Sequence, residues 1–294
     1  MTPTLVRHHR GADPSAPADA GTRARDWAEI QERMLAPLYE AVYDRLEVGA
    51  ATRMLSLGCG SGLAMLVAAA RGAHVTGVDS DRERLALARA RLLPGAGWDD
   101  APAHSAQPAR RRARLLEDGG AAASGADGAP YDLITVFEPI GCAAGDSEGL
   151  VPALESAVPL AARGATVVLT GWGPPERCAT AAVLRVAARL AESARPPRTA
   201  SGGWRPTLRD DLEEVASRAG LKPDGSGRVS CPFGYADVGS AVRGLLSTGL
   251  FDAAVRATDR SQVEKEVAEA LHPYRRPDGT VWMPNVFRYL VCVT

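Results

Sequence analysis

The sequence predicts an α/β protein built on a doubly wound, mainly parallel sheet, and residues 53–79 carry most of that prediction. Residues 54–57 form an apolar run of strand length, and a glycine-rich turn at 58–62 then breaks it with a bend that no bulky side chain tolerates. An alanine- and leucine-rich stretch at 63–71 predicts a helix, and 74–78 predicts the next strand. A strand, a turn, a helix and a second strand in this order form half of a nucleotide-binding fold.

The glycine-rich turn and the carboxylate of Asp79 are expected to face the same space. The free N–H groups of the turn and the positive end of the helix dipole point there. Asp79 follows the second strand, where a carboxylate can accept hydrogen bonds from two ribose hydroxyls. A dinucleotide fingerprint would have its third glycine at position 63, which is leucine here. The pattern favours an adenosine-like ligand, and a nicotinamide-type unit or a turn without ligand stays as the alternative.

The G-x-G-x-G pattern of the turn, followed by Asp79, resembles motif I and the post-I acid of the class I S-adenosylmethionine-dependent methyltransferases. The resemblance implies S-adenosylmethionine as cofactor and a Rossmann-like, seven-stranded sheet with an antiparallel last strand. One position departs from it. Where the family usually has an acid that holds the cofactor's ammonium group, this chain has a serine, which accepts a hydrogen bond but has no charge. The positions matched to cofactor contacts are Ser56, Gly58, Cys59, Gly60, Gly62, Asp79 and Ser80.

Two further acids follow predicted strands. Residues 113–117 are expected to form a short strand, and the family reads the adenine amino group with an acid just after it. Asp118 is the nearest match and Glu117 the alternative. Residues 131–137 form a clear buried strand that resembles motif IV, and Glu138 follows at its tip. Because ligands of doubly wound sheets lie outside the carboxyl ends of the strands, Glu138 is expected to face cofactor or substrate.

The remaining sequence predicts a helical cap formed by insertions. From residue 23 to 48, apolar residues recur at spacings of three and four, which predicts an amphipathic helix kinked at Pro37. The two insertions flank one strand, so they are expected to pack with this helix over the rim of the sheet. The predicted parts are a loose tail at 1–22, an N-terminal lid helix at 23–48, the S-adenosylmethionine-binding core at 49–173, a cap insertion at 174–206, and the end of the sheet at 207–294 with a second helical insertion at 236–271.

Aromatic residues near the predicted rim are candidates for substrate contacts, and packing in the core is the competing interpretation. Methyl transfer is an in-line displacement in which the protein mainly aligns the nucleophile and the methyl group, so no fixed catalytic motif is expected. Glu138 and His272 are the polar groups expected to orient the acceptor, with His272 as a base candidate. The expected substrate contacts are Trp27, Trp172, Phe233, Tyr235 and Tyr274.

The tracts CPFGYADVGSAVRGLL and HPYRRPDGTVWMPNVFRYLV resemble the C-terminal part of bacterial small-molecule methyltransferases of secondary metabolism. The predicted function is methyl transfer to a hydroxyl, amine or carbon of a small, fairly apolar metabolite, as a tailoring step of natural-product or antibiotic biosynthesis. The alternative is a protein that binds S-adenosylmethionine without methylating, either a scaffold or a sulfonium-assisted cyclase, and Ser56 keeps this alternative open. Leu63 argues against a nicotinamide-dependent oxidoreductase.

Composition narrows the class of partner. The chain of 294 residues has a formal net charge of −1 and no basic stripe of the kind that binds nucleic acid, which favours a small-molecule substrate. Five widely spaced cysteines with no histidine at ligand spacing predict neither disulfides nor a metal site. The N-terminus does not resemble a signal peptide, and no apolar run reaches membrane-spanning length. A cytoplasmic protein, monomeric or homodimeric, is expected, with no membrane partner.

Overall fold

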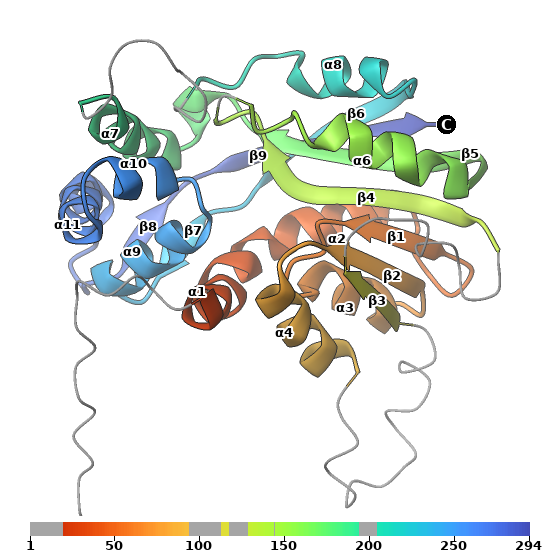
Figure 1. Ribbon diagram of the computed structural model, residues 1–294, viewed down its shortest axis with the longest axis horizontal. Helices are drawn as coiled ribbons and strands as arrows, with labels where there is room; N and C mark the ends of the chain where they lie inside the picture. Colours follow the sequence, from red (N-terminus) through yellow and green to blue (C-terminus); the bar gives the residue numbers. More distant parts are fainter. Residues whose placement is uncertain (1–19, 94–112, 118–128, 144, 194–204) are drawn as a thin grey trace, which may run out of the picture.

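The computed structural model of the protein describes residues 20–93, 113–117, 129–143, 145–193 and 205–294. A seven-stranded sheet lies at its centre, with helices on both faces and a further group of helices at one end (Figure 1). The strands follow one another in the order β3-β2-β1-β4-β5-β9-β6. They are β1 (Arg53–Leu57), β2 (His74–Asp79), β3 (Ala113–Glu117), β4 (Tyr131–Ile140), β5 (Ala161–Trp172), β6 (Lys222–Ser230) and β9 (Val286–Val293).

The strand directions confirm the predicted fold class. The pairs formed among β1 to β5 are all parallel, and β9 is antiparallel to both of its neighbours, β5 and β6. The strand order reverses beside β1, because the chain first moves outward to β2 and β3 and then returns to β4. In doubly wound sheets ligands bind outside the carboxyl ends of the strands at such a switch point. The end of β1 is therefore where a site is expected.

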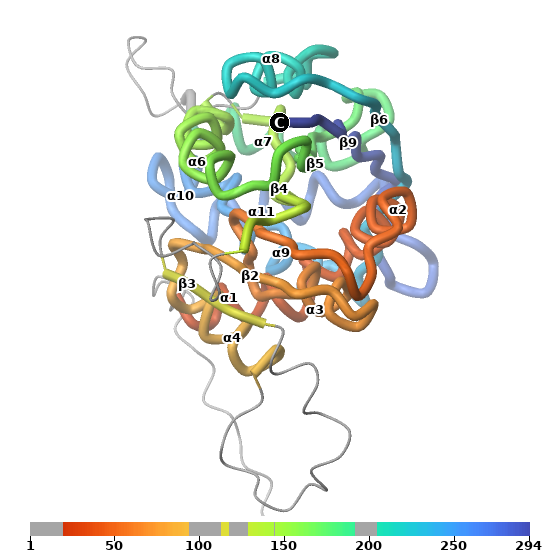
Figure 2. Tube along the Cα trace, turned by 90° about the vertical axis from the view of Figure 1, so that its right-hand side faces the viewer, coloured from red at the N-terminus to blue at the C-terminus, as the bar shows by residue number. Residues whose placement is uncertain are grey.

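Each face of the sheet has its own helical layer and its own core. The adjacent residues Met54 and Leu55 of β1 belong to the two different cores, because successive side chains of a strand point to opposite faces. Figure 2 shows the two layers on either side of the strands. One layer contains α2 (Ala36–Arg45), α3 (Leu63–Ala70) and α4 (Arg82–Leu92), and the other contains α6 (Leu150–Ala157) and α8 (Asp211–Arg218).

The N-terminal helix is irregular in the stretch that precedes α2. α1 (Ala20–Asp26) continues into a π-helical turn, η1 (Trp27–Gln31), and a 3-10 turn, η2 (Glu32–Leu35), before α2 begins. Pro37 is the second residue of α2, a position where the missing N–H is tolerated. The helix is therefore irregular in the turns before Pro37, whereas Pro37 itself lies in the regular helix α2. Turns of the π type are frequent at functional sites.

The cap combines helices of both insertions with the N-terminal helix. α7 (Thr180–Ser193) comes from the first insertion and packs against α10 (Asp252–Ala257) and α11 (Arg260–Ala270) of the second. α9 (Val238–Ser247) packs against α1 and η1. Gly244 permits this approach, because an added Cβ would lie 2.8 Å from a side-chain carbon of η1.

A two-stranded antiparallel sheet, which the sequence did not predict, joins the cap to the main sheet. It consists of β7 (Phe233–Tyr235), which follows β6, and β8 (Val281–Met283), which precedes β9. Each strand has three residues, which is too few to show a strand periodicity in the sequence. Three short 3-10 turns complete the described elements: η4 (Val158–Leu160), η5 (Pro175–Arg177) and η6 (His272–Tyr274).

Gly77→Ala is expected to destabilise the fold. β2 passes so close to α3 that an added Cβ would meet Sδ of Met65 and, at 2.9 Å, Sγ of Cys59. Both side chains are buried, and overpacking of this kind costs about 1–3 kcal/mol. Gly149→Ala is the control, because its Cβ would meet no atom within 4 Å. Urea denaturation should give a lower free energy of unfolding for Gly77→Ala alone; equal values would contradict this close packing.

Candidate active site

The glycine-rich turn connects β1 to α3 and needs glycine for its backbone conformation. Gly58, Gly60 and Gly62 have φ angles of 63°, 57° and 81°, in the region that favours glycine. At Gly62 an added Cβ would also lie 3.0 Å from the Cβ of Ala88 on α4. The turn therefore exposes backbone where any other residue would introduce a side chain and strain.

Asp79 lies at the carboxyl end of β2, beside this turn. Its carboxylate accepts a hydrogen bond from the N–H of Gly60 at 2.7 Å and another from the N–H of Asp81 at 2.8 Å. Each carboxylate oxygen has a further lone pair, which suits a pair of ribose hydroxyls. A cavity of about 460 Å³ opens at this edge, and the residues of the turn and strand tips that line it are Leu57, Gly58, Val78, Asp79, Ser80 and Glu138.

Glu32 is the site residue that sequence reasoning missed. It begins η2, is only 2% exposed, and lays its carboxylate against the glycine-rich turn. Oε1 accepts hydrogen bonds from the N–H groups of Ser61 at 3.1 Å and Leu63 at 3.5 Å. Oε2 accepts from the Ser61 hydroxyl and from Nη1 of Arg91 at 2.8 Å. One buried carboxylate thus fastens the N-terminal helix to the start of α3.

These contacts change what the turn can bind. The first N–H groups of a helix ordinarily attract an anion such as a pyrophosphate. Here Glu32 uses the N–H of Ser61 and Asp79 uses that of Gly60. A phosphate group would find both donors taken. The geometry therefore favours a ligand without a pyrophosphate, in agreement with the leucine at position 63.

Trp27 covers the turn from η1. Its indole Nε1 is buried, has no hydrogen-bond partner within the described ranges, and would lie 3.3 Å from a Cβ added to Gly60. The guanidinium of Arg84 lies over the indole ring, 4.5 Å from its centre, and holds it by a cation–π contact. Buried polar groups are nearly always hydrogen-bonded. The indole therefore keeps one donor for a molecule bound at the turn.

Glu138 reaches the same cavity from β4. Its Oε2 lies 3.6 Å from the place of a Cβ on Gly58. Glu138 is exposed near the end of β4. Desolvation of its carboxyl group by the surrounding protein raises the pKa of Glu138, with Arg84 opposing the rise and Asp79 adding to it. A carboxylate with a raised pKa is a stronger base, which suits it to taking a proton from an acceptor molecule.

The other predicted cofactor positions have different surroundings. Ser56 is buried within β1. Burial raises the pKa of the Cys59 thiol to about 12, so the thiol stays protonated near neutral pH. Asp118 lies outside the described residues. Glu117, its alternative, is exposed at the end of β3 and forms an ion pair with Arg82.

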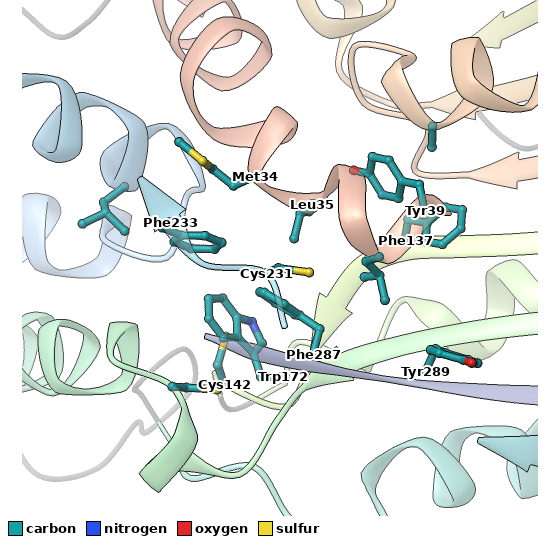
Figure 3. Packing of buried hydrophobic residues seen from close by; sticks show 14 of the residues in the cluster. Met34, Leu35, Tyr39, Phe137, Cys142, Trp172, Cys231, Phe233, Phe287 and Tyr289 are labelled. Atoms are coloured by element: carbon teal, nitrogen blue, oxygen red, sulfur yellow. The ribbon is translucent and has the colours of Figure 1, made fainter. Parts of the chain in front are cut away.

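Two of the predicted substrate contacts, Trp172 and Phe233, pack in the buried core (Figure 3), and Tyr235 belongs to the same cluster. The ring of Trp172 lies 4.7 Å from that of Phe287 and 6.1 Å from that of Phe233, measured between centroids. The hydroxyl of Tyr235 donates to Oε1 of Gln31 at 2.9 Å. Packing therefore accounts for the observed contacts of these aromatic side chains, and Trp27 is the aromatic residue that the structure brings to the turn.

His272 and Tyr274 belong to η6, which packs against α11 and β8. His272 is exposed and Tyr274 is half-buried. Neither of them lines the cavity that Glu138, the other predicted catalytic residue, borders.

The residues at the turn fit an adenosine-containing cofactor. The cavity of about 460 Å³ lies within the range of small-molecule sites, Asp79 borders it, and the orphaned N–H of Trp27 lies over the turn. Among the residues that the structure describes, no group of three His, Cys, Asp or Glu side chains could hold a metal ion. A search of the same residues finds no helix with the length and hydropathy needed to cross a membrane.

Glu32→Gln is expected to loosen the N-terminal helix. The change keeps the side-chain size but removes the charge that Arg91 faces, and breaking such a buried pair costs about 3 kcal/mol. Glu29→Gln, at an exposed acid of the same helix, is the control. Amide hydrogen exchange over residues 20–35 should accelerate in the first variant only. Unchanged exchange would show that contacts other than those of Glu32 hold the helix.

Glu138→Gln is expected to change how stability depends on pH. Because the folded protein raises the pKa of Glu138 above its ordinary 4.5, the folded state binds the proton more tightly than the unfolded state. Stability is therefore lost as the pH rises from 4.5 through the folded pKa. The variant should therefore have a higher melting temperature than the wild type at pH 8, and the same melting temperature at pH 4. Glu155→Gln, at an exposed residue of α6, is the control. Parallel melting profiles for wild type and Glu138→Gln would rule out the shift.

Residues 55–101 match the family model of a methyltransferase domain. Among solved structures, a candidate methyltransferase from Bacillus halodurans superposes with a TM-score of 0.50 at 10% identity, covering 87% of this chain and 97% of that one. The protein YjhP of E. coli gives 0.49 at 16% identity, with 92% and 98% covered. A SAM-dependent methyltransferase from Thiobacillus denitrificans, in complex with S-adenosyl-L-homocysteine, gives 0.48 at 15% identity, with 94% and 98% covered. No curated protein sequence matches the chain.

The matched segment contains several parts of the site: the end of β1, the glycine-rich turn, α3, β2 and α4. Trp27, Glu32 and Glu138 lie outside it. The sheet order and the antiparallel β9 supply the rest of the fold that the resemblance implies. The domain match over residues 55–101 and the order of the seven-stranded sheet agree with the class I S-adenosylmethionine-dependent methyltransferase fold that the sequence predicts.

Proposed function

We propose that the protein transfers the methyl group of S-adenosylmethionine to a hydroxyl, amine or carbon atom of a small, fairly apolar metabolite. In this proposal the reaction is a tailoring step in the biosynthesis of a natural product such as an antibiotic. The observation that carries it is the cavity where Gly58, Asp79 and Glu138 meet at the switch point of the sheet. The bound cofactor supplies an electrophilic methyl group on a sulfonium. The residues of the chain must then align the nucleophile of the acceptor with that methyl group.

Asp79 is the residue proposed to hold the ribose, because it lines the cavity while two backbone N–H groups fix the orientation of its carboxylate. The glycine-rich turn is proposed to hold the methionine end, with Trp27 above it as a hydrogen-bond donor. Since Ser56 brings no charge, we expect the ammonium end to depend on backbone carbonyls and neighbouring polar groups more than it does in the family. Asp118 stays a proposal for the adenine amino group.

Glu138 is the residue proposed to orient the acceptor and to take its proton. It borders the cavity, and its raised pKa suits it to a base near neutral pH. His272, in η6, does not line this cavity, and its proposed role as a base rests on its residue type alone. The apolar wall of the acceptor site is proposed to come from the cap and its surroundings, with Trp27, Trp172, Phe233, Tyr235 and Tyr274 as its aromatic residues.

Incubation with S-adenosylmethionine and a panel of ring-containing alcohols, amines and activated carbon acids, followed by mass spectrometry, tests the proposal. The expected result is one added methyl group on an acceptor, together with S-adenosylhomocysteine. Cofactor binding with no S-adenosylhomocysteine formed from any acceptor would favour the alternative, a scaffold or a sulfonium-assisted cyclase. We also propose that the protein is a cytoplasmic monomer or homodimer, and that its substrate is a small molecule and not a nucleic acid.

Asp79→Asn is expected to weaken binding of S-adenosylhomocysteine by about 1–3 kcal/mol, because the charge that strengthens the hydrogen bonds to the ribose is lost. Asp224→Asn, at an exposed position of β6, is the matched control. Titration calorimetry of the wild type and both variants measures the difference. Equal affinities for all three proteins would remove Asp79 from the cofactor site.

A further inference from the structure

A second cavity, of about 850 Å³, lies at the end of β5 on the face of the sheet that α8 covers. Its walls come from the loop after β5, the segment before α8, and the strands β6 and β9. It contains neither Asp79 nor Glu138 nor any residue of the glycine-rich turn. We call it the arginine groove after four of the residues that line it: Arg177, Arg209, Arg228 and Arg288.

Two acids near the arginine groove already have cationic partners. Glu213 of α8 forms a two-pronged ion pair with Arg288, whose Nη1 lies 2.8 Å from Oε2. Asp211 binds Nη1 of Arg205 at 2.9 Å. Glu176 is the other acid in the lining.

Three arginines of the groove have no acidic partner. Within the described part of the chain, the side chains of Arg177, Arg209 and Arg228 form no hydrogen bond or ion pair. The groove therefore has more positive charge than the protein itself neutralises.

The strand register brings two of the arginines side by side. Arg228 of β6 pairs directly with Arg288 of β9. Side chains at paired positions of antiparallel strands share one face, with Cβ atoms about 4.5–5.5 Å apart, and like charges at such positions are destabilising. Arg288 points toward α8, since it binds Glu213 there, so Arg228 lies on that face too. Of these two adjacent arginines, Arg288 has the ion pair with Glu213 and Arg228 has none among the described residues.

We propose that the arginine groove binds the carboxylate or phosphate group of a small anionic ligand. Guanidinium groups form paired hydrogen bonds with the oxygens of exactly these anions, and a negative group between the arginines supplies the missing counter-charge. Leu208, which is 61% exposed, and Pro174 and Pro175 give the groove an apolar wall for the rest of the ligand. The volume is that of a small-molecule site. This site is separate from the cofactor cavity and does not depend on the proposed function.

The test uses the full chain with inorganic phosphate and with malonate as probes, and with sodium chloride at equal ionic strength as the salt control. Thermal unfolding is followed over a series of probe concentrations for the wild type, Arg228→Gln, Arg209→Gln and the control Arg218→Gln, an exposed arginine at the end of α8 outside the groove. One probe or both should raise the melting temperature of the wild type and of Arg218→Gln in a saturable way. Arg228→Gln and Arg209→Gln should need at least about tenfold more probe.

A second readout separates a binding site from a general salt effect. Without probe, Arg228→Gln should melt above the wild type, because the repulsion with Arg288 is gone, whereas Arg218→Gln should show no such gain. A response to phosphate alone assigns the ligand a phosphate group, and a response to malonate alone assigns it a carboxylate. The proposal is overturned if neither probe acts beyond sodium chloride, if all variants respond equally, or if Arg228→Gln melts below the wild type.

Discussion

The carboxylate of Glu32 joins three parts of the molecule that are distant in sequence. It comes from the N-terminal helix, binds Ser61 in the glycine-rich turn and pairs with Arg91 of α4. A buried carboxylate without these partners would carry a desolvation penalty of several kcal/mol, so the three parts are stable only together. The cap depends on the same helix, because α9 packs against η1. The position of the cap relative to the cofactor cavity therefore depends on a contact made at the turn.

The irregular turns of the N-terminal helix explain how this contact forms. Gln31 and Glu32 are adjacent in sequence, yet both are buried, at 3% and 2% exposed. In a regular α-helix neighbouring residues point about 100° apart and do not share a face. The change from a π turn to a 3-10 turn between them gives each residue its own partner. Gln31 binds Tyr235 of β7 and Glu32 binds the turn, so one point of the helix contacts both the cap and the core.

Much of this arrangement was predictable, because each central strand is encoded by the pattern of its own residues. β4 and β9 appear in the sequence as mainly apolar runs, and the glycine-rich turn is specified by its own residues. The place of Glu32 was not predictable, since in sequence it resembles Glu29, an exposed acid of the same helix. β7 and β8 are too short for a pattern. His272 was expected at the site because its residue type suits a base, but distance from the turn is set by tertiary packing, which no local pattern records.

The position of β9 in the sheet bears on how the chain reaches this structure. Among the strands that the structure describes, β6 pairs with β9 alone, and β9 separates it from β5. While residues 231–285 are being synthesised, β6 therefore lacks this neighbour. During that interval β5 presents an open edge, and open edges invite pairing with other strands. When β9 inserts between β5 and β6, it pairs with both strands in a single step. This step requires closing a long loop, and the entropy cost of that closure comes before the new strand pairs form. We therefore expect the slow step of folding to be insertion of a strand into the interior of the sheet.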